Sequence, residues 1–206
     1  MSDPVPQIYL TTPALFELSG FATTLAEILD GFQIACVRLS LATNDENELI
    51  RAADVLRETC TARDVAMVID KHYRLAGQLG LDGVHLMEGT KNIREARKLL
   101  GPDAIVGAFC HTSRHVGMSA GEASADYVTF GPVSQTALGD GQIAETELFQ
   151  WWSEMIEVPV VAEGGLDEAH IKALRDYADF ISLGDEIWKH PDGPVKALGA
   201  VQKLLA

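Results

Sequence analysis

The strongest constraint on the fold is an alternation, repeated eight times, between short apolar runs and longer amphipathic stretches. The runs are rich in β-branched residues and apolar on both faces, which is typical of strands in a parallel sheet covered by helices. The stretches between them repeat apolar residues at spacings of three and four, as helices do. The eight runs are residues 8–10, 34–41, 65–69, 83–86, 105–110, 127–130, 158–161 and 180–183. Eight such units predict an α/β fold, a (β/α)8 TIM barrel, forming a single domain over residues 1–206.

Composition and charge narrow the classes of partner. The chain is 47% hydrophobic, which suits one well-packed core. It has no stretch near the ~18 apolar residues that span a bilayer. Its 30 acidic and 16 basic residues give a formal net charge of −14, which argues against binding to nucleic acid or an anionic membrane. The first residues lack the basic and apolar segments of a signal peptide, and Cys36, Cys60 and Cys110 are scattered. We therefore expect a cytoplasmic protein with reduced thiols.

Glycines mark the ends of the seventh and eighth runs, where a (β/α)8 barrel most often binds phosphate. Gly164 and Gly165 follow the seventh run and Gly184 follows the eighth. Backbone N–H groups at such glycines approach an anion closely, so we predict phosphate binding by these three residues and a small phosphorylated metabolite as ligand. The alternative is a tight turn in which Asp167 only caps the next helix. Asp185 would repel a phosphate unless its side chain turns outward or binds a cation.

Carboxylates follow the third and fourth runs. Asp70 ends a buried strand, where an unpaired carboxylate is costly. It is a candidate catalytic residue and a candidate Mg²⁺ ligand, with Glu88 as a second oxygen donor. The alternative is a structural ion pair between Asp70 and Arg38, which lies on the second run. Both interpretations stay open at this stage, and Arg38 is a catalytic candidate under the first.

Two histidines lie in or directly after strand runs. His85 lies inside the fourth run and is predicted to be a core residue. His111 directly follows the fifth run, on the catalytic side of the barrel, and is a candidate general acid or base.

A long, glycine-punctuated loop over residues 131–142 follows the sixth run and is a candidate lid. Its hydroxyl-bearing Thr136 is a candidate catalytic residue. In the next predicted helix, Trp151 and Trp152 are adjacent, so their side chains diverge by about 100° and one is less buried. Core packing is the first interpretation of these tryptophans, and the surface of a homodimer is the second.

Three motifs at the ends of the predicted strands resemble the thiamine phosphate synthase and thiazole tautomerase superfamily. They are LDGVHL at residues 81–86, ADYVTFGPV at 125–133 and PVVAEGGL at 159–166, and the resemblance covers residues 9–187. It implies a (β/α)8 barrel that joins a hydroxymethylpyrimidine diphosphate to a thiazole phosphate, releasing pyrophosphate with the help of Mg²⁺. It also implies that Arg38 and Asp70 are site residues, and that Gly164 and Gly165 bind the thiazole phosphate.

Other positions depart from the family's pattern. Ser40 replaces a lysine, Ile69 an asparagine, Thr90 a metal-binding carboxylate, Phe109 a serine and Gly139 a second lysine. Polar groups that stabilise a departing pyrophosphate are each worth a few kcal/mol, so their joint loss predicts a rate lower by ~10⁴-fold. Three hypotheses follow: a synthase with weakened or altered activity, a non-catalytic phosphate-binding paralogue, and another barrel enzyme that uses Asp70, Glu163 or His111 on a phosphorylated metabolite.

Overall fold

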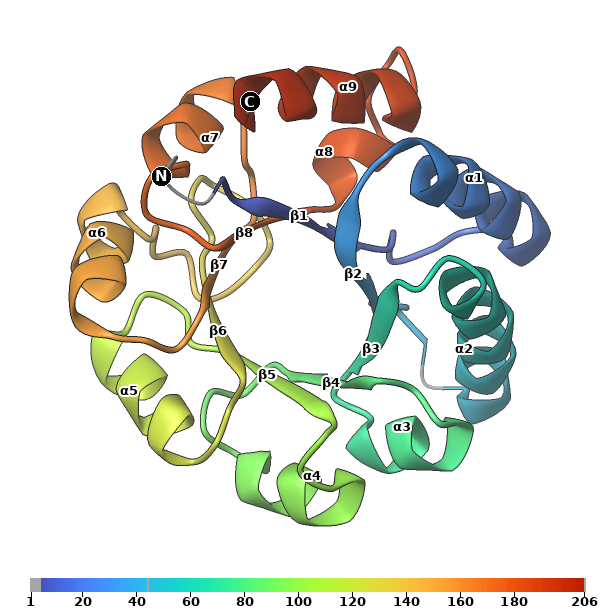
Figure 1. Ribbon diagram of the computed structural model, residues 1–206, viewed down its shortest axis with the longest axis horizontal. Coiled ribbons are helices and arrows are strands. Elements are labelled where there is room, and N and C mark those ends of the chain that lie inside the picture. The colour runs from blue at the N-terminus through green and yellow to red at the C-terminus, as the bar shows by residue number, and fades with distance from the viewer. Residues whose placement is uncertain (1–4, 44, 206) are drawn as a thin grey trace.

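The eight apolar runs form eight parallel strands, each hydrogen-bonded to the next, and β8 closes the ring onto β1 (Figure 1). This computed structural model describes residues 5–43 and 45–205. The closed barrel with alternating helices confirms the predicted (β/α)8 fold. The strands are β1 (Gln7–Thr11), β2 (Ile34–Leu39), β3 (Ala66–Asp70), β4 (Gly83–Leu86), β5 (Ile105–Phe109), β6 (Tyr127–Phe130), β7 (Val160–Glu163) and β8 (Phe180–Leu183).

Helices surround the barrel as an outer ring (Figure 1). They are α1 (Leu18–Gly31), α2 (Glu46–Thr61), α3 (Tyr73–Leu79), α4 (Ile93–Leu100), α5 (Arg114–Glu122), α6 (Thr146–Met155), α7 (Glu168–Leu174), the short α8 (Asp185–Trp188) and α9 (Pro194–Leu205). Across residues 5–43 and 45–205, none of these helices has the length and hydropathy needed to cross a membrane. The expectation of a missing signal peptide rests partly on residues 1–4, which lie outside the described residues.

The sequence explains why these segments are helical. In α2, Asp45 accepts a hydrogen bond from the Asn47 N–H at the first turn, and five residues at spacings of one to four are buried against the barrel. In α6, Trp152 is buried and its indole N–H donates to the Val158 carbonyl at 2.7 Å, so this tryptophan is a core residue. Trp151 is half-buried under the guanidinium of Arg114, 4.6 Å from the ring centre.

Some strands do not begin and end where their apolar runs do. The seventh run starts at residue 158, but β7 spans Val160–Glu163, two residues further along the chain. Pro159 has no N–H to donate to a neighbouring strand, so it contributes only its carbonyl, which accepts from Val128 N–H. An apolar run therefore marks the strand, and backbone pairing decides its ends.

Side chains that point into the barrel form layers, as expected for this fold. The layer nearer the amino ends of the strands is largely apolar and includes Tyr9, Cys36, Val68, Tyr127 and Val161. Two residues further along the strands the interior becomes polar, with Arg38, Asp70, His85, Thr129, Glu163 and Ser182 all buried. The carboxyl ends of the strands therefore carry the buried chemistry.

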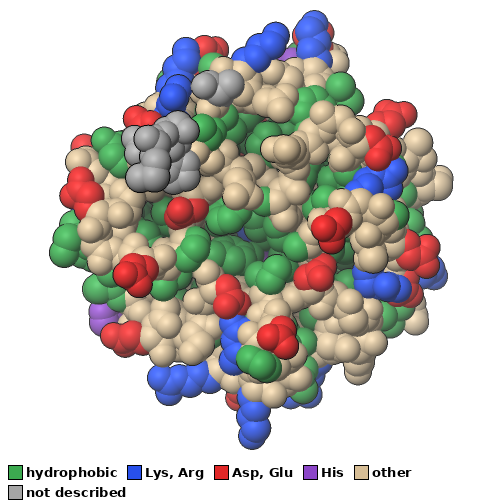
Figure 2. All heavy atoms as spheres, in the orientation of Figure 1, with side chains coloured by type: hydrophobic (Ala, Val, Ile, Leu, Met, Phe, Trp, Pro, Cys, Tyr) green, Lys and Arg blue, Asp and Glu red, His purple; other side chains and the backbone are tan. Residues whose placement is uncertain are grey.

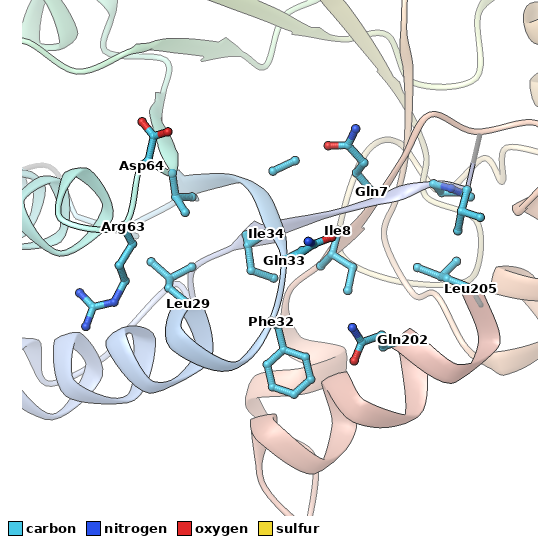
Figure 3. A pocket seen from close by; sticks show the side chains of 14 residues that line it. Gln7, Ile8, Leu29, Phe32, Gln33, Ile34, Arg63, Asp64, Gln202 and Leu205 are labelled. Carbon is cyan, nitrogen blue, oxygen red and sulfur yellow. The ribbon is translucent and has the colours of Figure 1, made fainter.

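The opposite end of the barrel, where the strands begin, faces the viewer in Figure 2. Hydrophobic side chains gather around the central hollow there, and acidic side chains are scattered around them (Figure 2). A cavity of about 710 Å³ lies at this end between β1, β2 and α9, with Gln7, Gln33 and Gln202 among its lining residues (Figure 3). None of its described lining residues has a buried, unpaired side-chain polar atom. We therefore place the candidate site at the other end.

Candidate functional site

The centre of the candidate site is a buried arginine held between two carboxylates. From β2, Arg38 donates a hydrogen bond to Glu163 at the end of β7, with Nη1 3.1 Å from Oε2, and a second contact joins Nη2 to Oε1. Its Nε lies 3.3 Å from Oδ1 of Asp70 at the end of β3. Arg38 is 3% exposed, Glu163 6% and Asp70 9%. The structure thus contains the predicted Arg38–Asp70 ion pair and adds Glu163 as the closer partner.

Electrostatics hold Arg38 in its charged form. Burial disfavours the guanidinium charge, but the carboxylates of Glu163 and Asp70 outweigh it and raise the pKa of Arg38 well above its ordinary value. Arg38 Nε and Asp70 Oδ1 are close enough for an ion pair, yet neither atom makes a hydrogen bond within the described chain. Buried polar atoms are rarely left unpaired, so these two mark a point at which a ligand or water would be favoured.

A cavity of about 440 Å³ opens beside this group. Its lining includes six of the predicted site residues, namely Arg38, Asp70, Thr136, Gly164, Gly165 and Gly184. A neighbouring hollow of about 730 Å³ shares Ser40 and Asp70 with it and adds Lys71 and His72. The structure therefore brings most of the predicted residues to one place, the carboxyl ends of the strands.

Three backbone N–H groups after β7 and β8, those of Gly165, Leu166 and Gly184, converge and form a cradle. Gly164 and Gly165 have φ values of +86° and +76°, which favour glycine. A Cβ on Gly165 would lie 1.9 Å from the hydroxyl oxygen of Ser134, and that hydroxyl donates to the Gly165 carbonyl at 2.7 Å. Asp167 also caps α7, accepting from His170 N–H at 2.9 Å. The tight turn and the Asp167 cap of the alternative interpretation are therefore present, and phosphate binding by these glycines stays a prediction.

The cradle already holds an anion from the chain itself, the carboxylate of Glu186. Its Oε1 accepts from Gly165 N–H at 2.7 Å and from Leu166 N–H at 3.2 Å, and its Oε2 accepts from Gly184 N–H at 2.8 Å. Glu186 is not among the predicted site residues, although its position two residues after Gly184, next to Asp185 in the same loop, is a signal for it.

The side chain of Asp185 points away from the cradle, so its carboxylate would not repel a phosphate there. Its carboxylate lies 2.6 Å from Lys189 Nζ, one turn along, and the side chain is largely exposed. Asp185 therefore turns outward from the cradle, although it still contributes to the cavity's rim.

His111 lies apart from this cavity. It is not among the described lining residues, its φ is +53°, and its ring packs on Phe109 with 4.5 Å between ring centres. Its Nδ1 is buried without a hydrogen-bond partner in the described chain. Thr136 lines the cavity, and its hydroxyl accepts from Leu138 N–H at 3.1 Å. Catalytic roles for both residues stay predictions.

The residues fit a magnesium ion only in part. Asp70 has a buried oxygen without a hydrogen bond, as a ligand would. Glu88 is exposed and forms an ion pair with Lys91, and it is not among the residues described as lining the cavity. Within residues 5–43 and 45–205, no three acidic, histidine or cysteine residues converge as a metal site. Of the two predicted metal ligands, Asp70 is therefore the one that lines the cavity, and a magnesium ion at Asp70 stays a prediction.

His85 is a core residue, as predicted. It is fully buried, and its Nδ1 lies 3.0 Å from the hydroxyl of Tyr127, which lies 2.8 Å from the hydroxyl of Tyr9. Burial, and then the charge of Arg38, hold the pKa of His85 well below its ordinary value. The neutral imidazole of His85 therefore connects the polar layer to the two tyrosines of the neighbouring layer.

Fold and site together define a (β/α)8 barrel in which backbone N–H groups of the loops after the last two strands hold the carboxylate of Glu186. Comparisons with known proteins are more specific. A family model described as thiamine monophosphate synthase matches residues 8–187. A thiamine-phosphate synthase of Rhodospirillum centenum is 42% identical over 201 residues, which cover 97% of each chain. One of Erythrobacter litoralis is 37% identical over 188 residues, which cover 88% of each.

The chain belongs to the thiamine monophosphate synthase family, and it is a thiamine phosphate synthase-like protein of thiamine biosynthesis. The thiamine phosphate pyrophosphorylase from Pyrococcus furiosus has a similar structure, with a TM-score of 0.81 and 97% of each chain covered. Its 22% identity makes that likeness evidence for the fold alone.

Proposed function

We propose that this protein binds phosphorylated thiazole and pyrimidine ligands at the carboxyl ends of its strands. It couples the thiazole to the pyrimidine slowly. The observation that carries the proposal is the amide cradle: three backbone N–H groups, from Gly165, Leu166 and Gly184, converge on one carboxylate. Fixed N–H donors of this kind suit phosphate oxygens equally well. Thiazole phosphate is the ligand class that family membership favours for them.

The remaining residues have defined parts in this proposal. Arg38 supplies positive charge at the cavity, fixed in place by Glu163. Asp70 is the carboxylate that would hold Mg²⁺, and the bound ion would neutralise a diphosphate as it leaves. Thr136 contributes a hydroxyl at the cavity's edge.

Slow coupling is proposed because cationic groups are scarce around the cavity. Among its described lining residues, Arg38 is the single lysine or arginine, and two carboxylates already neutralise it. Lys71 lies in the neighbouring hollow. A departing pyrophosphate needs several placed charges, each worth a few kcal/mol in the transition state.

The alternative of a different barrel enzyme with Glu163 as its base is less well supported. Both oxygens of Glu163 contact the Arg38 guanidinium, so the carboxylate is engaged with a cation. A non-catalytic paralogue would use the same cradle, and activity alone separates it from a slow synthase.

Calorimetric titration with thiazole phosphate, with and without Mg²⁺, tests the ligand site. Gly165→Glu should abolish binding, because the added Cβ would lie 1.9 Å from Ser134 Oγ and strain a backbone at φ +76°, which displaces the Gly165 N–H from the cradle. Gly141→Glu is the matched control, since Gly141 has φ +89° and nothing within 4 Å of an added Cβ. Equal affinities in wild type and the Gly165→Glu variant would remove the cradle from the proposal.

A further inference from the structure

Glu186 occupies the position that a phosphate group would take. Its two carboxylate oxygens bridge the loops after β7 and β8, one bonded to Gly165 and Leu166 and the other to Gly184. A phosphate placed on the same N–H groups would put its oxygens where these two lie. Since each N–H donates one strong hydrogen bond, the carboxylate and the phosphate exclude each other.

Charge makes the exclusion stronger. Among the described lining residues of the cavity, the carboxylates of Asp70, Glu163 and Glu186 outnumber the single guanidinium of Arg38, while Asp185 pairs with Lys189 at the rim. A phosphate dianion bound beside an undisplaced Glu186 would meet that carboxylate at hydrogen-bonding range in a partly buried site, where repulsion is weakly screened.

Only the side chain of Glu186 has to move. The backbone of α8 is held on both sides, because the indole N–H of Trp188 donates to the Thr11 carbonyl at 2.6 Å and Ile187 is buried. Glu186 itself is half-buried, and it reaches the cradle through a flexible side chain that can rotate toward the open cavity.

We propose that Glu186 is an internal competitor that closes the cradle in the free protein and is displaced when a phosphorylated ligand binds. This inference rests on the proposed phosphate site. It makes Glu186 a specificity residue, since a ligand must offer an anion that binds the cradle better than a carboxylate already tethered there. An occupancy of about 90% by Glu186 would weaken the apparent affinity about tenfold.

The test compares wild type, Glu186→Gln, Asp185→Asn and Gly165→Glu by titration with inorganic phosphate and with thiazole phosphate. Glu186→Gln removes the charge and keeps the shape. Asp185→Asn removes an equal charge from the same rim without touching the cradle, because Asp185 contacts Lys189. We expect about tenfold tighter binding in Glu186→Gln and less than a twofold change in Asp185→Asn, with no binding in Gly165→Glu. The amide resonances of Gly165 and Gly184 should also shift in ligand-free Glu186→Gln.

Each other result has a defined meaning. Unchanged or weaker binding in Glu186→Gln overturns the competition while leaving the phosphate site intact, provided that wild type binds and Gly165→Glu does not. Equal tightening in Glu186→Gln and Asp185→Asn would show a general charge effect and also overturns it. Failure of every variant to bind, Glu186→Gln included, overturns both the competition and the phosphate site.

Discussion

Arg38 is the residue on which the candidate site depends most, because two buried carboxylates share its charge. Replacing Arg38 with methionine should lower the free energy of unfolding by about 3–5 kcal/mol, since Glu163 and Asp70 would be left buried without a counter-charge. Urea unfolding of the variant and of wild type measures this loss in the free energy of unfolding. Arg63→Met is the control, because Arg63 pairs with Asp30 at the surface, where such pairs are worth about 1 kcal/mol or less. Equal losses in the two variants would contradict the role given to Arg38.

His85 should make stability depend on pH. Its pKa is held well below the ordinary value by burial and by Arg38, so the folded protein keeps it neutral while the unfolded chain takes up a proton below about pH 6.5. Stability should therefore fall as pH decreases from about 6.5, by up to about 1.4 kcal/mol per pH unit from this group.

Chemical unfolding at pH 7, 6 and 5 measures that slope. His85→Gln, which cannot titrate, should show a slope smaller by up to one proton, whatever its stability at pH 7. His190→Gln, at an exposed histidine, controls for the substitution itself. A slope in His85→Gln equal to that of wild type would mean that His85 is not the titrating group.

At the scale of residues, some contacts of the site could be predicted from the sequence and others could not. Asp70 and Arg38 were paired as one of two interpretations, since an unpaired buried carboxylate is costly. The bond from Arg38 to Glu163 spans 125 positions, and only the closed barrel and its register place the two ends together. The position of Glu186 after Gly184 placed it in the right loop, but its bond back to Gly165 depends on the side-chain rotamer, which the sequence does not determine.

At the scale of elements, the loops after β6 and β7 form a unit. Gly165→Ala should be more destabilising than Gly141→Ala, although both residues have positive φ, because the added Cβ would meet Ser134 Oγ at 1.9 Å in the first case and open space in the second. We expect an extra loss of about 1–3 kcal/mol, from overpacking and the loss of the bond to the Gly165 carbonyl.

Thermal unfolding of both alanine variants gives this difference directly. Similar unfolding temperatures for the two would show that the loop around Ser134 moves away freely. The sequence predicted this loop as a lid, and the Ser134 contact shows one way in which it is tied to the cradle. Loop contacts of this kind follow no period, so they could not be predicted as the strands were.

At the scale of the whole molecule, the eightfold alternation sufficed for the fold because its signal is repeated along the entire chain. The same fold predicts that functional residues lie at the carboxyl ends of the strands. Gly164, Gly165, Gly184 and Asp70 line a cavity there. The net charge of −14 adds a long-range field that opposes an anionic ligand, so a few placed donors must overcome it.

Steady-state coupling of hydroxymethylpyrimidine diphosphate with thiazole phosphate in the presence of Mg²⁺ is the most direct test of the proposed function. The thiamine-phosphate synthase of Rhodospirillum centenum, assayed in parallel, is the positive control. We predict measurable binding of thiazole phosphate with turnover well below ~1 s⁻¹, because Arg38 is largely neutralised by its two carboxylates. Turnover of ~1 s⁻¹ or faster would contradict the account and show that other residues stabilise the departing pyrophosphate.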